Sequence, residues 1–406
     1  MRVAVVGSGV SGLVAAHLLH PAHEVTVFEA GPWIGGHVHT VEVDGVAVDT
    51  GFIVFNDLTY PNFRALLDRL GVETQPSTMS FSVRCDRTGL EWNGADLNRL
   101  FVQRRNLFRP SFHRMIRDVL RFNREAPGVL ANGEADLELG AYVERHGYSR
   151  PFLDHYLVPM GSAIWSMPPA RLLRFPAGFF VRFFANHGML SVDDRPTWRV
   201  VRGGSRAYVE RLVAPFRDRI RTETPVRRVR RFEDRVELEP GGAFDHVVFA
   251  CHSDQALRVL ADPSPAEREI LGALPYQPND VVLHTDASLL PRRRHAWAAW
   301  NYHVGTDPEA PAAVTYDMNI LQSLQAEETW CITLNRAGAI DPARVRGRWT
   351  YHHPVYSAGG VRAQARHGEI SGAARTHYCG AYWGYGFHED GVNSALRVAA
   401  AFGRRP

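Results

Sequence analysis

A glycine-rich turn near the start of the chain constrains the fold more than any other feature. Residues 1–6 are apolar, the sequence Gly7-Ser8-Gly9-Val10-Ser11-Gly12 follows, and residues 10–19 have the apolar character of a buried helix. A second strand-like run, residues 24–28, ends at Glu29. This order predicts a strand, a tight turn, a helix and a second strand, which together are typical of a dinucleotide-binding unit.

The chemistry of such a turn gives each residue a predicted task. Gly7 permits the tight bend, Gly9 lets the backbone approach a pyrophosphate, and Gly12 lets the helix pack closely on the strand. The positive end of the helix dipole favours the phosphate charge. Glu29 is expected to hold the ribose hydroxyls of the dinucleotide.

Composition excludes several other classes of protein. The 406 residues are 45% hydrophobic and 22% charged, as expected for a folded chain of two domains or one large composite domain. A net charge of +3 argues against a nucleic-acid-binding protein. All 46 basic residues are arginine, so Schiff-base chemistry and a lysine general base are excluded.

The cysteines and the hydropathy pattern bear on metals and location. Four cysteines lie far apart without a Cys-x-x-Cys pair, so we expect no metal site and no disulfide framework. No run approaches the roughly 18 apolar residues that cross a bilayer, and we expect no signal peptide in the glycine-broken start. These observations predict a cytoplasmic protein.

The strand pattern predicts an α/β protein with interleaved domains. We expect a Rossmann-like, glutathione-reductase-like cofactor domain assembled from residues 1–58, 195–275 and 350–406. Residues 59–194, rich in arginine and phenylalanine helices, and residues 276–349, rich in β-branched and aromatic strands, are expected to form an α+β substrate domain.

Further motifs carry a resemblance to a known superfamily. Residues 29–36, an acid followed by the doublet Gly35-Gly36, and the later Asp-x-Gly strand at residues 49–51 resemble the FAD domain of flavin amine oxidases and carotenoid desaturases. Residues 35–40, 49–56, 316–319 and 384–391 resemble one branch more closely. That branch comprises bacterial NAD/FAD-binding proteins associated with cyclopropane fatty-acyl-phospholipid synthases. The likeness runs along nearly the whole chain and implies FAD as cofactor.

The resemblance assigns roles to individual residues of this sequence. It gives Ser11 a phosphate contact and gives Gly35, Gly36 and His37 a contact with the pyrophosphate and the flavin. Thr50, Gly51 and Phe52 would lie beside the isoalloxazine ring, and the backbone at Val226 would meet adenine. Gly380 would lead into Gly391 and Val392, on a helix whose N-terminus favours the anionic reduced flavin.

Departures from the superfamily pattern bear on the reaction. Amine oxidases of this superfamily usually place a lysine near flavin N5, and this chain has none. No second Gly-x-Gly-x-x-Gly is present, so no NADPH domain is expected. His37 stands where the family usually has arginine. The candidate proton carriers are His37, His39, His388 and Glu389, although structural contacts with FAD explain the same positions.

Two apolar segments of the predicted substrate domain allow a functional and a purely structural interpretation. Residues 99–124 hold eight arginines against one acid, Asp118, and from Phe112 onward the apolar residues fall at helical spacing. This pattern is typical of a helix that lies on anionic lipid, or of a core helix with a solvated arginine face. The phenylalanine-rich run at residues 175–184 suits the lining of an apolar tunnel or core packing.

Together these features predict an FAD-dependent oxidoreductase that accepts a hydride from a C–H bond of a lipid or isoprenoid. Peripheral contact with an anionic membrane is part of this hypothesis. One alternative is an amine oxidase that cages a small amine with aromatic residues such as Trp383 and Tyr385. Another is a flavin-binding accessory protein, without turnover, that supports a lipid methyltransferase partner.

Overall fold

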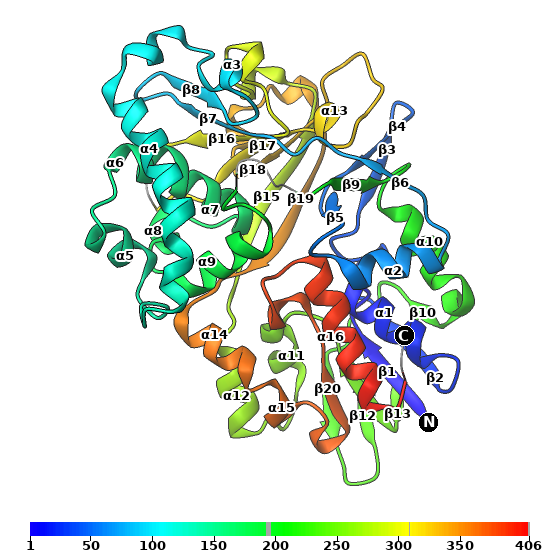
Figure 1. The fold of residues 1–406 in the computed structure, drawn as a ribbon. Helices are drawn as coiled ribbons and strands as arrows, with labels where there is room; N and C mark the ends of the chain where they lie inside the picture. The colour runs from blue at the N-terminus through cyan, green and yellow to red at the C-terminus, as the bar shows by residue number, and fades with distance from the viewer. Residues whose placement is uncertain (192–195, 308, 405–406) are drawn as a thin grey trace.

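The computed structural model describes residues 1–191, 196–307 and 309–404. Figure 1 shows two regions: a sheet with helices near both chain termini, and a second sheet flanked by a helical lobe at the other end. The predicted domain limits at residues 195 and 406 lie outside the described residues.

The first region is built on a five-stranded parallel sheet. Its order is β10 (Ile220–Arg221), β2 (Glu24–Phe28), β1 (Arg2–Val6), β14 (His246–Phe249) and β20 (Thr376–Tyr378). Val3 pairs with Val25 on one side and with His246 on the other. All five strands come from the three segments predicted for the cofactor domain, and the α/β fold class is confirmed.

Helices α1 (Val10–Leu19) and α16 (His388–Ala401) pack together against this sheet. Nearly every side chain of α1 is buried, because the helix lies between the sheet, α16 and α10 (Arg206–Val213). This enclosure explains why the sequence of α1 is apolar on all sides and shows no amphipathic stripe.

The second region contains a seven-stranded sheet. Its order is β19 (Val345–Pro354), β15 (Tyr276–His284), β18 (Cys331–Leu334), β17 (Ala313–Asp317), β16 (Trp300–Val304), β7 (Phe81–Cys85) and β8 (Leu90–Asn93). All neighbouring pairs are antiparallel except β16 and β7. Strand β19 crosses the predicted boundary between residues 349 and 350, so the sheet reaches beyond that boundary.

A helical lobe packs beside this sheet (Figure 1). It contains α4 (Pro110–Glu125), α5 (Leu139–Arg145), α6 (Arg150–Phe152), α7 (Val158–Trp165), α8 (Pro169–Leu172) and α9 (Ala177–Asn186). Phe112, Met115 and Phe122 of α4 are buried, so its apolar stripe belongs to the core. In α9, Phe180 and Phe184 are fully buried, whereas Phe183 also reaches the cavity described below.

Among the described residues, the remaining strands form three smaller sheets of two or three strands. The remaining strands are β3 (Thr40–Val43), β4 (Val46–Asp49), β5 (Val54–Asn56), β6 (Thr74–Pro76), β9 (Trp198–Val201), β11 (Arg228–Arg231), β12 (Val236–Glu239) and β13 (Gly242–Phe244). The remaining α-helices are α2 (Pro61–Arg69), α3 (Leu97–Leu100), α11 (Ser253–Val259), α12 (Pro265–Gly272), α13 (Met318–Leu321), α14 (Ala358–Ala365) and α15 (His367–Ile370). In the part of the chain that the structure describes, no helix is long and apolar enough to span a membrane.

Candidate active site

The glycine turn after β1 brings backbone segments into very close contact. A methyl group at Gly12 would lie 2.0 Å from the Gly7 carbonyl oxygen, and Gly7 itself has a φ of +108°. Both positions therefore require glycine. At Gly9 the same methyl group would meet nothing within 4 Å. The protein itself leaves space above Gly9, as expected if another molecule approaches the backbone there.

The glycine doublet lies directly against this turn. Gly35 donates its N–H to the Ser8 carbonyl at 3.0 Å, and a methyl group at Gly36 would lie 3.0 Å from the Gly9 Cα. The two predicted phosphate-contacting segments thus form one surface of bare backbone beside the N-terminus of α1. Such a surface suits a pyrophosphate.

Glu29 is held at the carboxyl end of β2 by the turn. Its Oε2 accepts hydrogen bonds from the Ser8 N–H at 2.9 Å and the Ser8 hydroxyl at 2.5 Å, and its Oε1 accepts from the Gly31 N–H at 2.7 Å. The Thr224 N–H donates to the Glu29 carbonyl at 2.8 Å, which brings the segment of Val226 beside this carboxylate. The structure thus brings Glu29 and the segment of Val226 together, and their contacts with ribose and adenine stay a prediction.

The C-terminal motif completes the same region. A methyl group at Gly391 would lie 2.6 Å from Val10 Cγ1 and 2.9 Å from Ser11 Oγ, so α16 begins in close contact with the start of α1. Val392 is buried in the core beside them, and the Gly380 N–H donates to Ser394 Oγ at 2.9 Å. The glycine turn, the doublet, Glu29 and this helix start together fit the diphosphate and ribose of FAD.

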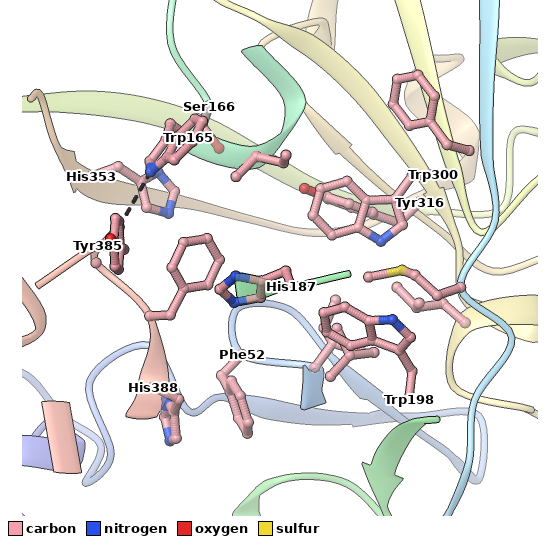
Figure 2. A pocket seen from close by; sticks show the side chains of 18 of the residues that line it. Phe52, Trp165, Ser166, His187, Trp198, Trp300, Tyr316, His353, Tyr385 and His388 are labelled. Atoms are coloured by element: carbon pink, nitrogen blue, oxygen red, sulfur yellow. Dashed lines mark hydrogen bonds between the residues drawn. The ribbon is translucent and has the colours of Figure 1, made fainter. Parts of the chain in front are cut away.

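A large cavity adjoins this region. It has a volume of about 490 Å³ and extends between Thr50-Gly51-Phe52 and the seven-stranded sheet (Figure 2). Aromatic and apolar side chains dominate its wall. They include Phe52, Phe81, Trp165, Phe183, Trp198, Trp300, Tyr316, Tyr351, Tyr356 and Tyr385, with Met79, Met160, Met189, Ile164 and Leu321.

Thr50 is fixed at the edge of the cavity by a hydrogen-bond network. Its hydroxyl lies 2.7 Å from Tyr351 Oη and 2.8 Å from His39 Nδ1, and His39 stacks on Trp33 with ring centroids 4.5 Å apart. Burial lowers the pKa of His39. His39 therefore holds the Thr50 side chain through this hydrogen bond. It is not among the described residues that line the cavity.

His37 and His388 reach the cavity wall. The His388 ring stacks on Phe52 with centroids 3.6 Å apart, and its Nε2 lies 2.6 Å from the Tyr208 hydroxyl. Burial lowers the pKa of His37 to about 4 and that of His388 to about 3. Both imidazoles are neutral at physiological pH, so His37 does not supply the cation that arginine would supply.

Glu389 lies on another side of α16. Its carboxylate accepts hydrogen bonds from the Asn62 N–H at 3.0 Å, the Asn62 side-chain amide at 3.0 Å and the Phe63 N–H at 2.8 Å. It thus caps the N-terminus of α2 and is absent from the described cavity wall. The geometry assigns Glu389 a structural role in place of proton transfer.

The structure also changes the predicted amine cage. Tyr385 lines the cavity, and its carbonyl accepts a hydrogen bond from Trp165 Nε1 at 3.3 Å (Figure 2). Trp383 instead packs against His367 in the core of the cofactor region, with ring centroids 4.6 Å apart. These two aromatic residues therefore do not face one ligand.

Sequence reasoning missed His187, which follows α9 and lines the cavity. Its Nδ1 lies 3.0 Å from the Phe183 carbonyl, so Nδ1 carries the proton and Nε2 keeps a lone pair. Burial lowers its pKa to about 4. The signal in the sequence was a histidine four residues after a phenylalanine of an apolar helix, which places both side chains on one helix face.

His353, also missed, has the opposite tautomer. The Asn335 side-chain amide donates to Asn279 Oδ1 at 2.7 Å, so the Asn279 amide nitrogen donates to His353 Nδ1 at 2.8 Å. Its proton is therefore on Nε2. Burial lowers its pKa to about 3. The cavity wall thus holds a neutral imidazole acceptor, His187, and a neutral imidazole donor, His353.

Comparison with known proteins agrees with this geometry. Residues 10–402 match the family model of flavin-containing amine oxidoreductases. The chain belongs to this family, and it is an FAD-dependent oxidoreductase. The predicted resemblance to the superfamily and the predicted cofactor are confirmed.

Solved structures share the fold over nearly the full length. Cyclohexylamine oxidase from Brevibacterium oxydans is 16% identical with a TM-score of 0.71, and 98% of each chain is covered. A CLA-producing fatty acid isomerase from P. acnes is 14% identical with a TM-score of 0.72, over 99% of this chain and 98% of that chain.

Curated relatives match over short stretches only. Zeta-carotene desaturase from Synechocystis sp. is 39% identical over 75 residues, which are 18% of this chain and 15% of the relative. Protoporphyrinogen oxidase 2 from Arabidopsis thaliana is 44% identical over 72 residues, 18% of this chain and 14% of the relative.

We predict that Gly9→Ala and Gly12→Ala separate cofactor binding from folding. Gly9→Ala has room in the protein, so the apo form should keep its thermal midpoint while its Kd for FAD rises at least roughly tenfold. Gly12→Ala forces the backbone of α1 away from Gly7 and should lower the thermal midpoint itself. Calorimetric titration with FAD and thermal unfolding of the apo proteins check both results. Equal loss of stability in the two variants would contradict the prediction that Gly9 faces the cofactor while Gly12 packs on the protein backbone.

Glu389→Gln is expected to lower the free energy of unfolding without slowing flavin reduction. The neutral amide loses the charge interaction with the N-terminus of α2, which is worth about 1 kcal/mol. Denaturant unfolding should show this loss, while the rate of flavin reduction stays within about twofold, below 0.5 kcal/mol. Much slower flavin reduction with an unchanged free energy of unfolding would mean that Glu389 does carry protons in the reaction.

Proposed function

We propose that the protein removes hydrogen from a C–H bond of a largely apolar molecule, such as an acyl chain or an isoprenoid. The observation that carries this proposal is the wall of the cavity beside Thr50-Gly51-Phe52. Among the described residues of that wall there is no aspartate, glutamate or arginine. Its surface is formed mainly by aromatic rings, methionines and aliphatic side chains.

This composition favours an apolar substrate over a charged amine. An ammonium group in the cavity would lose its hydration without gaining a carboxylate partner from the described wall. The aromatic faces offer a cation–π contact, but Trp383 lies elsewhere and leaves the predicted cage incomplete. An acyl or isoprenoid chain, in contrast, gains free energy from burial against the same rings.

A few polar groups of the wall remain for orienting the substrate. Among the described residues, the Trp300 indole N–H and the Tyr356 hydroxyl are buried without a hydrogen-bond partner. The His353 Nε2–H can donate to a substrate oxygen, and the His187 lone pair can accept a hydrogen bond. The substrate that fits best is therefore an apolar chain that carries one or a few oxygen atoms.

The residues of the chain divide the work of the reaction. When bound, FAD supplies the acceptor for a hydride. Thr50, held by Tyr351 and His39, shapes the cofactor side of the cavity, and Phe52 with His388 closes it. The start of α16, at His388, presents the positive end of a helix dipole, which favours negative charge there. As one carbon of the substrate gives up a hydride, His187 Nε2 takes a proton from the neighbouring carbon, and the electron pair of that second C–H bond forms a C=C double bond.

The relatives support both an apolar and an amine substrate. By name, the P. acnes isomerase acts on a fatty acid and the Synechocystis relative desaturates zeta-carotene, whereas the Brevibacterium enzyme oxidises cyclohexylamine. The lack of lysine throughout the sequence and the uncharged wall of the cavity favour an apolar substrate over an amine.

Anaerobic bleaching of the FAD-loaded protein tests the substrate class. Monounsaturated fatty acids, phospholipids and isoprenoids should reduce the flavin absorption, while cyclohexylamine and putrescine should leave it unchanged. Bleaching by amines alone would overturn the proposal in favour of an amine oxidase. Flavin that no compound reduces, in a protein that copurifies with a lipid methyltransferase, would establish the accessory role.

His187→Phe is predicted to slow flavin reduction by roughly 10²-fold or more because the proton acceptor is lost. FAD affinity should not change. In the wild type the base is neutral above its pKa of about 4, so the rate should fall as the pH drops through about 4 and stay level toward neutrality. Stopped-flow reduction across pH measures this, with the exposed His295→Gln as control. A rate within twofold of wild type would rule out His187 as the base.

A further inference from the structure

Three of the exposed large hydrophobic side chains lie on two neighbouring elements at one end of the molecule. Leu97 is 75% exposed, Leu107 45% and Phe108 88%, the highest exposure among the large hydrophobic residues that the structure describes. They belong to α3 and to a short 3-10 helix, Arg104–Phe108, that leads into α4. Figure 1 shows α3, β8 and the start of α4 at the end opposite the chain termini. Exposed apolar side chains that lie near one another can form an interaction surface.

Arginines surround these apolar side chains. Between residues 87 and 117 the side chains of Arg87, Arg99, Arg104, Arg105, Arg114 and Arg117 are all exposed. The carboxylates of the same stretch are Glu91, which is buried, and Asp96, which caps α3 and pairs with Arg99. The exposed charge of this stretch is therefore strongly positive.

A second segment, distant in the sequence, adds more positive charge to the same end. Arg292, Arg293 and Arg294 are exposed and lie where a short turn packs against α3 and β8. The Arg292 guanidinium pairs with Asp86 at 3.7 Å and that of Arg293 with Glu91 at 3.9 Å, so Arg294 adds the charge that these carboxylates do not offset. The Arg292 N–H donates to Glu91 Oε1 at 2.7 Å and the Arg293 N–H to Glu91 Oε2 at 3.2 Å. Glu91 thus fixes this arginine run beside the apolar patch. We call Leu97, Leu107, Phe108 and the surrounding arginines the arginine–phenylalanine tip.

This tip differs from the apolar stripe predicted in the sequence. The stripe of α4, with Phe112, Met115 and Phe122, is used by the core. The exposed apolar residues instead precede the helix, where Asn106 is the buried member of the 3-10 turn and Phe108 points to the outside. The outer arginines of α4 lie next to them in sequence. Core packing therefore does not explain why apolar residues occupy the exposed positions 97, 107 and 108.

We propose that the arginine–phenylalanine tip docks on an anionic lipid bilayer. Guanidinium groups bind phosphate groups of the lipids, and Phe108, Leu107 and Leu97 enter the boundary between headgroups and acyl chains. The apolar side chains favour a bilayer over nucleic acid, because a duplex offers phosphates without an accessible apolar layer. This inference does not depend on the proposed reaction.

Vesicle sedimentation with the full-length, FAD-loaded protein tests the docking. The protein should sediment with phosphatidylcholine vesicles that contain phosphatidylglycerol and remain in solution with pure phosphatidylcholine. Binding should be lost near 1 M salt, where charges are screened within about 3 Å. Equal binding to both vesicles, or no binding to either, overturns the proposal.

Variants assign the binding to the tip. Arg104→Glu with Arg105→Glu should weaken vesicle binding at least roughly twentyfold, since each arginine near the surface contributes about fivefold. Leu107→Ser with Phe108→Ser should also weaken it severalfold. The control is Arg268→Glu with Arg362→Glu, an equal charge change on α12 and α14 at the other end, and it should bind as wild type. An equal loss in the control would mean that net charge alone is responsible.

A label at residue 108 tests insertion directly. Of the native cysteines Cys85, Cys331 and Cys379 are buried and Cys251 is partly buried, so a Phe108→Cys variant carries an exposed thiol for an environment-sensitive dye. Its emission should shift to the blue on anionic vesicles, and the same dye on an Arg268→Cys variant should not respond. Binding to duplex DNA that depends on Arg104 and Arg105 but not on Phe108, with no blue shift on vesicles, would identify nucleic acid as the partner instead.

Discussion

The whole cofactor side of the molecule depends on how closely the backbone packs at a few glycines. Gly12 lies on Gly7, Gly36 lies on Gly9, and Gly391 lies against Val10 at the start of α1. A side chain at Gly12, Gly36 or Gly391 would push apart segments that must lie together. Because the backbones touch, their N–H groups and the N-terminus of α1 gather at one place, which suits the diphosphate of FAD.

The substrate side follows a different physical rule, namely that charge is kept out. Burial holds His37, His187, His353 and His388 in the neutral form, and fixed hydrogen bonds decide which nitrogen of His187 and His353 carries the proton. A neutral imidazole in an apolar cavity can accept or donate one proton without a permanent charge to solvate. The cavity thus places neutral imidazoles among apolar side chains, which is the basis of the substrate class proposed above.

The sequence predicted those parts of the site that are defined by local backbone geometry. The glycine turn, the doublet, Glu29 and Gly391 lie where the motifs placed them, because spacing along the chain dictates the turn and the helix start. The roles of His388 and Glu389 were not separable, since neighbouring residues of a helix point about 100° apart and only the packing of α2 shows which one faces the cavity.

His187 and His353 escaped sequence analysis for a related reason. His353 obtains its tautomer from Asn279, whose own orientation is set by Asn335, and only the tertiary fold brings these residues together. The partner of His187, the Phe183 carbonyl, is local, but only the fold shows that this side of the helix end lines the cavity. The same holds for the apolar residues of α4. Their helical spacing is visible in the sequence, but whether they face the core depends on the helices that pack beside them.

The parallel sheet joins parts of the chain that are far apart in the sequence. Strand β1 and helix α1 come from one of these parts, whereas α16, which packs on α1, and β20, which forms the sheet edge beyond β14, come from another. The glycine turn is therefore a local structure, but the groove around it exists only when both parts have folded together. A mutation that loosens α16 would open the nucleotide groove from a site remote in sequence.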